Sequence, residues 1–348
     1  MRILVCGGAG FIGSRFVERR LGSTDDSMIV LDRLTYAGGR DNLEAVEADQ
    51  SLAPRLRFVE GDICDAETVA RLVADADAVV NVAAETHVDR SILDPAAALR
   101  TNVVGVHALL EAVRTAPALP DGRRRRYLQV STDEVYGPCE GDPHRETDAL
   151  APRSPYAASK AAGDLFTLAA HETHDLDVVI TRGANTYGRR QHPEKLVPLF
   201  ITNAIDGQPL PLYGDGQQRR DWIFVDDHAD AISTVLDGGE AGSIYNIPAG
   251  HERANVEVTR AILDHLGRPW SLVRRVEDRP GHDRRYAMAG ERIASLGWSP
   301  ATAFDDGIRS TVDWYREHEA WWRQRRDRAW DDYYEQQYGR RLATATTG

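Results

Sequence analysis

Short apolar runs alternate with helical patterns through the first half of the chain. Strands are expected at the runs that are almost continuously apolar, residues 2–6, 28–32, 56–60, 78–82, 127–131 and 178–182. Helices are expected where apolar side chains recur at helical spacing, residues 11–21, 66–74, 101–115 and 157–172. Strands that alternate with helices predict right-handed βαβ units and an α/β fold built on a doubly wound parallel sheet.

The pattern changes after about residue 185, because prolines and glycines interrupt residues 193–216. Residues 243–247 form a further apolar run that we expect to return to the sheet as a strand. Helices are expected at 255–266 and 306–338, the second of which is rich in tryptophan. The expected organisation is a first domain over 1–185 with a return segment near 221–248, a smaller, mixed C-terminal region over 186–340, and a flexible tail over 341–348.

Composition excludes several classes of function. The chain has 348 residues, enough to bury a large core, and a net charge of −12, which argues against nucleic-acid binding. The apolar runs fall short of the about 20 residues that span a bilayer, and the first residues do not resemble a secretory leader. We therefore expect a cytoplasmic protein with no membrane partner. Three cysteines without paired spacing predict neither a disulfide framework nor a metal site.

The first motif is a glycine-rich run, GGAGFIG at residues 7–13, directly after the first expected strand. It fits the spacing G-x-G-x-x-G, in which glycines permit a tight turn and a diphosphate approaches backbone amides at a helix N-terminus. Asp32 ends the second expected strand, where a carboxylate accepts hydrogen bonds from ribose hydroxyls and repels a 2′-phosphate. This pattern predicts a dinucleotide-binding domain of the Rossmann type and favours NAD over NADP, although the neighbouring Arg33 is a residue type that holds a phosphate. A purely structural glycine turn is the alternative.

Asp62 follows the third expected strand. Its carboxylate is placed to hydrogen-bond the edge of an adenine ring, and it is equally well placed to cap the following helix. Spacing alone leaves both interpretations open.

The second motif is YAASK at residues 156–160, inside an expected helix. Tyr156 and Lys160 are four residues apart and therefore share one face of that helix. The ammonium of Lys160, together with an oxidised nicotinamide, would lower the pKa of the Tyr156 phenol from about 10 toward neutrality, so that the phenolate could accept a hydroxyl proton while hydride leaves the same carbon. Only two of the 42 basic residues are lysines, Lys160 and Lys195, which hints that an ammonium is required at these positions.

The third motif is STDEVYG at residues 131–137, at the end of an expected strand. Ligands of open α/β sheets bind at the carboxyl ends of strands. Burying Asp133 beside Glu134 is costly, which raises the pKa of one carboxyl and permits a protonated acid next to an ionised base. A solvated turn with helix-capping carboxylates is the alternative interpretation.

These motifs together resemble a known family. The glycine-rich run and Y-x-x-x-K resemble the extended short-chain dehydrogenase/reductase superfamily, and their combination with Thr132, Asp133 and Glu134 resembles the dTDP-glucose 4,6-dehydratases within it. Supporting stretches lie at residues 32–38, 83–91, 193–196, 213–216, 220–222 and 278–283. The likeness extends from residue 1 to about residue 325.

The resemblance implies a redox-neutral elimination on a nucleotide-diphosphate hexose, with NAD as cofactor. Tyr156 would remove the C4 hydroxyl proton, Glu134 would abstract the C5 proton, and Asp133 would protonate the departing C6 hydroxyl. Thr132 would hydrogen-bond the C4 oxygen. A nucleotide-sugar 4-epimerase or a uronate decarboxylase would share Tyr156 and Lys160, but an epimerase has no need of the Asp133-Glu134 pair. A non-catalytic NAD-sensing protein is the alternative from outside the enzymes.

The resemblance also implies which residues touch the ligands. The cofactor set is Gly7, Gly10, Phe11, Ile12, Gly13, Asp32, Leu34, Thr35, Asp62, Ile63, Ala83, Ala84, Thr86, Thr101, Tyr156, Lys160 and Thr186. The substrate set is His87, Thr132, Asn185, Lys195, Leu196, Pro211, Tyr213, Arg220, Asn255, Arg279 and His282. Guanidinium groups such as those of Arg220 and Arg279 bind diphosphate oxygens in a bidentate manner.

The resemblance further implies a homodimer formed through a four-helix bundle, for which the helices at 101–115 and 157–172 are the candidates. This chain departs from the family at a few positions. Thr186 stands where asparagine is usual, Gly183-Ala184 replaces Cys-Ser, Arg189-Arg190 replaces a proline and an aromatic residue, and Ala289 replaces an aspartate.

Overall fold

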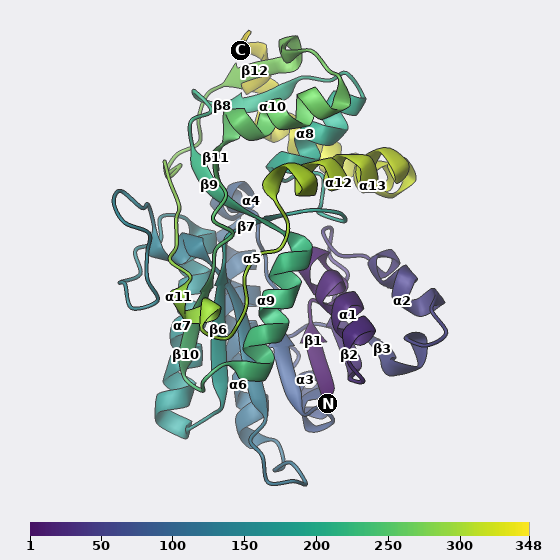
Figure 1. Ribbon diagram of the computed structural model, residues 1–348, viewed down its shortest axis with the longest axis vertical. Helices are drawn as coiled ribbons and strands as arrows, with labels where there is room; N and C mark the ends of the chain where they lie inside the picture. Colours follow the sequence, from purple (N-terminus) through teal and green to yellow (C-terminus); the bar gives the residue numbers. More distant parts are fainter. Residues whose placement is uncertain (348) are drawn as a thin grey trace.

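The computed structural model describes residues 1–347, and a parallel sheet lies at its centre (Figure 1). Within these residues the strand order is β10-β6-β5-β4-β1-β2-β3, and every neighbouring pair is parallel. The strands are β1 (Arg2–Cys6), β2 (Ser27–Asp32), β3 (Leu56–Glu60), β4 (Ala78–Asn81), β5 (Arg126–Thr132), β6 (Val178–Gly183) and β10 (Ser243–Ile247). This is the predicted Rossmann-type sheet. The order reverses at β1, which lies between β2 and β4, and such a switch point opens a crevice at the carboxyl ends of the strands.

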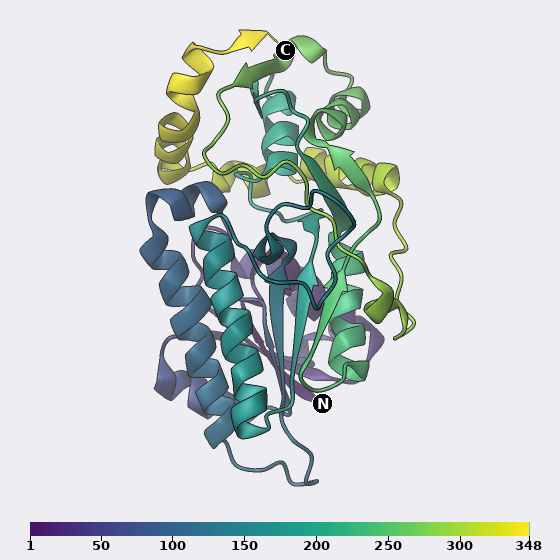
Figure 2. The same ribbon diagram turned by 90° about the vertical axis from the view of Figure 1, so that its left-hand side faces the viewer.

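Helices cover both faces of the sheet (Figures 1 and 2). They are α1 (Phe11–Ser23) and α9 (Val225–Gly238) on one face, and α3 (Ala66–Ala74), α6 (Val106–Thr115) and α7 (Pro155–His174) on the other. Side chains of β1 alternate between two apolar cores: Ile3 packs in the core that contains Phe16 of α1, and Leu4 packs in the core that contains Leu72 of α3. A strand that is buried on both faces requires the nearly continuous apolar sequence from which it was predicted.

Short helices and turns lie between the strands in the N-terminal third of the chain. They are α2 (Glu44–Ala48), α4 (Val88–Leu93), α5 (Pro95–Leu99) and the 3-10 turn Arg40–Leu43, with a wide turn at Arg100–Gly105 that leads into α6. Figure 2 shows α6 and α7 side by side along the outer face of the sheet.

A second, smaller region lies beyond the carboxyl ends of the strands and has a core of its own (Figure 1). Two small sheets belong to it, with the strand orders β11-β9-β7 and β13-β12-β8. Its strands are β7 (Asn185–Tyr187), β8 (Leu210–Tyr213), β9 (Arg219–Phe224), β11 (Glu252–Ala254), β12 (Val273–Val276) and β13 (Thr346–Thr347). Its helices are α8 (Leu196–Ile205), α10 (Asn255–Leu266), α12 (Phe304–Glu317), α13 (Glu319–Arg325), α14 (Arg328–Tyr334) and α15 (Arg340–Ala343), while α11 (Glu291–Ala294) packs near β10.

The single helix expected over 306–338 is wrong. The chain leaves helical geometry at His318 and again at Arg326, so α12, α13 and α14 are separate helices. These breaks let the chain wrap around the second core, where the side chain of Trp322 is fully buried. A continuous helix could bury only one stripe of side chains.

The C-terminal segment also differs from the expected flexible tail. Residues 340–343 form α15, and Thr346–Thr347 pairs in antiparallel fashion with β12. Residue 348, the last of the expected tail, lies outside the described residues. Across residues 1–347, no helix combines the length and apolarity needed to cross a membrane.

Candidate active site

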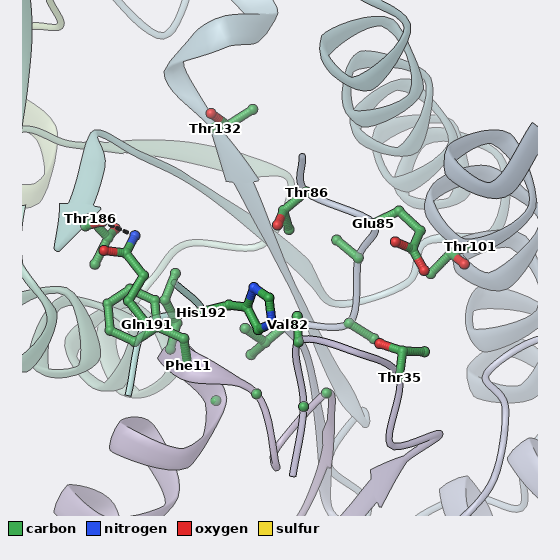
Figure 3. Close-up of a pocket in the computed structure, with 18 of the residues that line it drawn as sticks. Phe11, Thr35, Val82, Glu85, Thr86, Thr101, Thr132, Thr186, Gln191 and His192 are labelled. Carbon is green, nitrogen blue, oxygen red and sulfur yellow. Dashed lines mark hydrogen bonds between the residues drawn. The ribbon is translucent and has the colours of Figure 1, made fainter. Parts of the chain in front are cut away.

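A cavity of about 290 Å³ opens at the carboxyl ends of the strands, beside the switch point at β1. Thr35, Glu85 and Thr101 lie on one side of it, and Thr186 and Gln191 lie on the opposite side (Figure 3). The structure brings most of the expected ligand residues together in its walls: Gly7, Gly10, Phe11, Ile12, Gly13, Asp32, Thr35, Asp62, Ile63, Ala83, Ala84, Thr86, Thr101, Thr132, Asp133, Glu134, Tyr156, Asn185, Thr186 and Lys195.

The glycine-rich run forms a turn that admits no side chains at two of its positions. Gly7 has a φ of +76°, and a Cβ atom there would lie 2.6 Å from the backbone nitrogen of Ala83. A Cβ atom on Gly13 would lie 2.1 Å from the carbonyl oxygen of Gly7. Gly10 is the N-terminal cap of α1 and has no capping side chain, so the first amides of this helix are free to bind an anion.

Asp32 is fixed by the same turn. Its Oδ2 accepts a hydrogen bond from the amide of Ala9 (2.9 Å), and its Oδ1 accepts one from the amide of Leu34 (2.9 Å). Burial raises the pKa of Asp32, and the two amides oppose that rise. Leu34 does not line the cavity; it has a φ of +52° and supports Asp32 through its backbone.

The helix-capping interpretation of Asp62 is wrong, and its contact with an adenine ring stays a prediction. Asp65, rather than Asp62, caps α3 by accepting hydrogen bonds from the amides of Glu67 and Thr68. Asp62 instead accepts from Arg33 Nη1 (3.0 Å) and from the amide of Cys64 (2.9 Å), and it lines the cavity. The guanidinium group of Arg33 is therefore paired with the carboxylate of Asp62, and both residues line the cavity.

Thr132, Asp133 and Glu134 form the end of β5 and the tight helical turn that follows it. Thr132 caps the turn: its Oγ1 accepts from the amide of Glu134 (3.4 Å) and donates to Asp133 Oδ1 (3.1 Å). Asp133 is 3% exposed, and its Oδ2 has no hydrogen-bond partner among the described residues. Burial, reinforced by the charge of Glu134, raises the pKa of Asp133 to about 8. The raised pKa favours the protonated form of Asp133, which is the form that a general acid requires.

Glu134 has a different electrostatic environment. Burial raises its pKa, but the positive charges of Arg279, Arg220 and Lys195 act in the opposite direction. The pKa of both carboxyls is raised, but three positive charges oppose the rise at Glu134 and only one, that of Arg220, opposes it at Asp133, so Glu134 is the more readily ionised of the two.

Tyr156 and Lys160 lie on α7, which begins at Pro155 after the capping residue Ser154. The Lys160 ammonium donates to the carbonyl oxygen of Val130 (2.6 Å), and burial lowers its pKa to about 8 against the opposing charge of Asp164. Lys160 does not line the cavity; its ammonium binds the backbone of β5, one of the strands that end at the cavity. Burial and the charge of Glu134 raise the pKa of Tyr156, so the lowering expected from the sequence requires a further positive charge beside the phenol.

The remaining expected substrate residues lie outside the cavity wall, all in the second region except His87, which caps α4. They are His87, Leu196, Pro211, Tyr213, Arg220, Asn255, Arg279 and His282. Asp89 joins several of them, because its carboxylate accepts from the Tyr213 hydroxyl (3.2 Å) and pairs with Arg279 Nε (3.6 Å). Arg220 lies over the ring of Tyr286, 4.2 Å from its centroid, and its positive charge acts on Glu134.

Several residues of the cavity were not predicted from the sequence. Gln191 donates to the carbonyl oxygen of Thr186 (2.9 Å; Figure 3), and His228 Nδ1 lies 2.7 Å from Thr186 Oγ1. A Cβ atom on Gly183 would lie 2.5 Å from Cε1 of His228, so glycine at this position makes room for the imidazole ring. His228 comes from α9, over forty residues later, and no local pattern indicates this contact.

Glu194 is a further missed residue of the cavity wall, although it lies within the stretch 193–196 that the resemblance includes. Its side chain is 1% exposed and accepts from Arg90 Nε (2.7 Å). Burial opposes its ionisation, but the charges of His87, His192, Lys195 and Arg90 lower its pKa to about 2. Within residues 1–347, no group of three or more His, Cys, Asp and Glu side chains is placed to hold a metal ion.

Comparison with known proteins supports the resemblance seen in the sequence. The sequence profile of the GDP-mannose 4,6-dehydratase family matches residues 4–311. A dTDP-glucose 4,6-dehydratase from Streptomyces niveus is 51% identical over 328 residues, covering 92% of this chain and 95% of the relative.

Solved structures agree with this result. A dTDP-glucose 4,6-dehydratase from Streptomyces venezuelae, crystallised with NAD bound, is 51% identical with a TM-score of 0.88 and covers 93% of this chain and 100% of its own. A UDP-glucose 4-epimerase from Thermus thermophilus, in complex with NAD, is 33% identical with a TM-score of 0.81 and covers 91% of this chain and 100% of its own. The predicted relationship to the dTDP-glucose 4,6-dehydratases is confirmed.

Proposed function

Because the chain belongs to the GDP-mannose 4,6-dehydratase family, we propose that it is an NAD-dependent dTDP-glucose 4,6-dehydratase, which converts dTDP-glucose to the 4-keto-6-deoxy sugar. The observation that carries this proposal is the convergence of Asp133, Glu134 and Tyr156 on one cavity that also contains the glycine-rich turn. One phenol, one acid and one base beside a dinucleotide are the minimum set for oxidation, elimination and return of hydride.

The residues present fit NAD. The glycine-rich turn leaves room for a diphosphate at the N-terminus of α1, and Asp32 presents a fixed carboxylate for ribose hydroxyls. When bound, NAD accepts hydride from C4 of the hexose and returns it to C6. We assign direct contacts with NAD to those residues of the expected cofactor set that line the cavity. Leu34 and Lys160 do not line it and would act through their contacts with Asp32 and with the backbone of Val130.

The side chains of this protein carry the proton transfers. Tyr156 removes the proton of the C4 hydroxyl, and Thr132 hydrogen-bonds the C4 oxygen. The resulting ketone acidifies the C5 proton, which Glu134 removes. Asp133 gives its proton to the C6 hydroxyl, which leaves as water. The raised pKa of Asp133 and the positive charges around Glu134 support this division of roles.

The second region supplies the nucleotide end of the site. The positive charges of Arg220 and Arg279 act on Glu134, Arg279 also pairs with Asp89, and guanidinium groups of this kind fit a diphosphate. We infer that residues 1–185, with the return segment 221–248, hold the cofactor, and that residues 186–340 mainly hold the nucleotide sugar. His87, Asn255 and His282, together with Leu196, Pro211 and Tyr213, would complete the nucleotide contacts.

The test is turnover of dTDP-glucose by the purified chain, with mass spectrometry of the product. We expect loss of one water without net accumulation of NADH. A product that has the mass of the substrate would indicate an epimerase, the activity of the 33% identical neighbour. A protein that binds NAD but turns over no nucleotide hexose would be an NAD sensor.

We further propose a homodimer formed through α6 and α7, located in the cytoplasm. The large apolar side chains exposed on this face support the dimer: Ile92, Leu93, Leu99, Val104, Leu165 and Phe166 are each between 41% and 58% exposed. They come from adjoining elements, α4 through α7, and Figure 2 shows this face uncovered. An apolar patch of this kind marks a protein interface. The free thiols of Cys6, Cys64 and Cys139 are compatible with a reducing compartment.

A further inference from the structure

The C-terminal helices reach back to the turn that would hold the cofactor. In Figure 1, α12 and α13 lie above α1 and α2, on the side of the sheet opposite α7. The indole Nε1 of Trp321 in α13 donates to Oδ1 of Asn42 (3.1 Å), and Asn42 Nδ2 donates to the carbonyl oxygen of Ala9 (2.8 Å). Ala9 lies inside the glycine-rich turn. We call Trp321, Asn42 and Ala9 the C-terminal brace.

Ala9 connects the brace to two parts of the cavity. Its carbonyl oxygen also accepts from the amide of Gly39 (3.2 Å), and its own amide donates to Asp32 Oδ2 (2.9 Å). Both peptide groups that flank Ala9 are therefore anchored: the Gly8–Ala9 amide on the carboxylate that faces the ribose, and the Ala9–Gly10 carbonyl on Asn42 and Gly39. Asn42 supplies the side-chain donor that holds the Ala9–Gly10 carbonyl in the turn that faces the diphosphate.

Asn42 is buried, with 1% of its surface exposed, so its amide depends on protein partners. Without the indole donor, Oδ1 would be a buried acceptor with no partner. The amide would then either remain unsatisfied or rotate, and rotation would break its bond to Ala9. Trp321 thus acts on the glycine-rich turn through Asn42, although it does not line the cavity.

Two further contacts hold α12 and α13 in this place. Arg325 lies over the Trp321 ring, 3.8 Å from its centroid, and its Nη2 donates to Asp41 Oδ1 (2.8 Å). The hydroxyl of Tyr315 in α12 donates to the carbonyl oxygen of Gln191, which lines the cavity. The C-terminal helices therefore reach the glycine-rich turn through Asn42 and contact Gln191 in the cavity wall.

We propose that Trp321, acting through Asn42, is a positioning residue that retains NAD during turnover. This proposal rests on the proposed function, in which the cofactor is regenerated in every cycle and has no need to leave. A reaction of this kind benefits from slow cofactor dissociation, whereas an ordinary dehydrogenase must release its cofactor. Through the C-terminal brace, the second region, which would bind the sugar, also acts on the rate at which NAD dissociates.

The test measures exchange of bound NAD for isotopically labelled NAD in the full-length holoenzyme. Trp321→Phe keeps an aromatic ring but removes the donor, and we expect NAD exchange to accelerate roughly threefold to tenfold. The weaker retention of NAD should raise the half-saturating NAD concentration of Trp321→Phe, while kcat measured with NAD in excess should stay at the parental value. Trp314→Phe is the matched control, because Trp314 is also half-buried and packs against Trp321 (5.0 Å between ring centroids), and it should exchange NAD at the parental rate.

Parental exchange in Trp321→Phe, or equal acceleration in Trp314→Phe, would overturn the proposal. If Trp321→Phe is insoluble, Asp41→Asn decides, because it removes an exposed partner of Arg325 and should accelerate exchange about twofold. No acceleration in Asp41→Asn would then overturn the proposal. A parental protein that binds no NAD at all would instead remove the proposed function, so the two failures are distinguishable.

Discussion

Replacing Asp133 by asparagine should make the protein more stable and nearly inactive. The asparagine amide has the shape of the carboxyl and can accept the hydrogen bond that Thr132 Oγ1 donates to Oδ1 (3.1 Å). It cannot transfer a proton to a leaving hydroxyl. General acid catalysis contributes about 10²- to 10⁴-fold, and we expect the dehydration rate to fall by that factor.

The stability gain follows from the pKa of the buried carboxyl, which rises from 3.8 to about 8. The folded state keeps this proton up to about pH 8, whereas the unfolded chain loses it near pH 4. The folded state is therefore favoured by this group only at low pH, and the advantage is lost as the pH rises from about 4 to about 8. At pH 7 the cost is at most about 4 kcal/mol, at roughly 1.4 kcal/mol per pH unit. Asparagine does not carry this cost.

Thermal unfolding at several pH values tests this reasoning. At pH 7 the melting temperature of Asp133→Asn should exceed that of the parent by up to roughly 5 °C, and the difference should vanish near pH 4. Asp148→Asn is the control of opposite sign, because hydrogen bonds from the amide of Arg145 and from His144 lower the pKa of Asp148. Its removal should destabilise the protein at pH 7. An Asp133→Asn variant that is less stable than the parent, or that dehydrates at the parental rate, would refute the assignment.

Three further changes test separate parts of the site. Glu134→Gln should permit oxidation at C4 but lower the dehydration rate by at least about 10²-fold, and a parental rate would show that another group removes the C5 proton. Arg220→Lys should raise the half-saturating concentration of the nucleotide sugar about tenfold, since lysine lacks the bidentate fork, while Arg219→Lys on the exposed neighbour should not. Phe166→Asp should convert the dimer to monomers in sedimentation experiments, because it places a charge in the exposed apolar face; Glu172→Asp, further along α7, is the control, and a Phe166→Asp dimer of parental affinity would exclude this interface.

The sheet was predictable because its signal is local. The buried strands β1, β4 and β6 are nearly continuous apolar runs, and the glycine-rich turn is required by close contacts such as that between Gly7 and Ala83. The site motifs also fall at strand ends, where parallel topology brings them together. Motif position therefore predicted the glycine-rich turn, Asp32 and the carboxyl pair, and the family resemblance implied most of the other residues of the cavity wall.

Features that depend on distant contacts were not predictable. His228 and Thr186 meet across more than forty residues, and Trp321 meets Asn42 across far more. The C-terminal helices break at His318 and Arg326 because Trp322 must enter the second core, and periodicity alone does not show such a turn. Burial and the charge of Glu134, which act on Tyr156 through space, raise its pKa, and the lowering expected beside an oxidised nicotinamide stays a prediction.

The most direct measurement of the central claim is turnover of dTDP-glucose in deuterium oxide, with product analysis at early times. Removal of the C5 proton by Glu134, loss of water through Asp133 and return of hydride to C6 require that C5 be reprotonated from the solvent. The product should therefore be lighter than the substrate by one water and carry one non-exchangeable deuterium, at C5. A product with the mass of the substrate, or a dehydrated product without deuterium at C5, would contradict the mechanism.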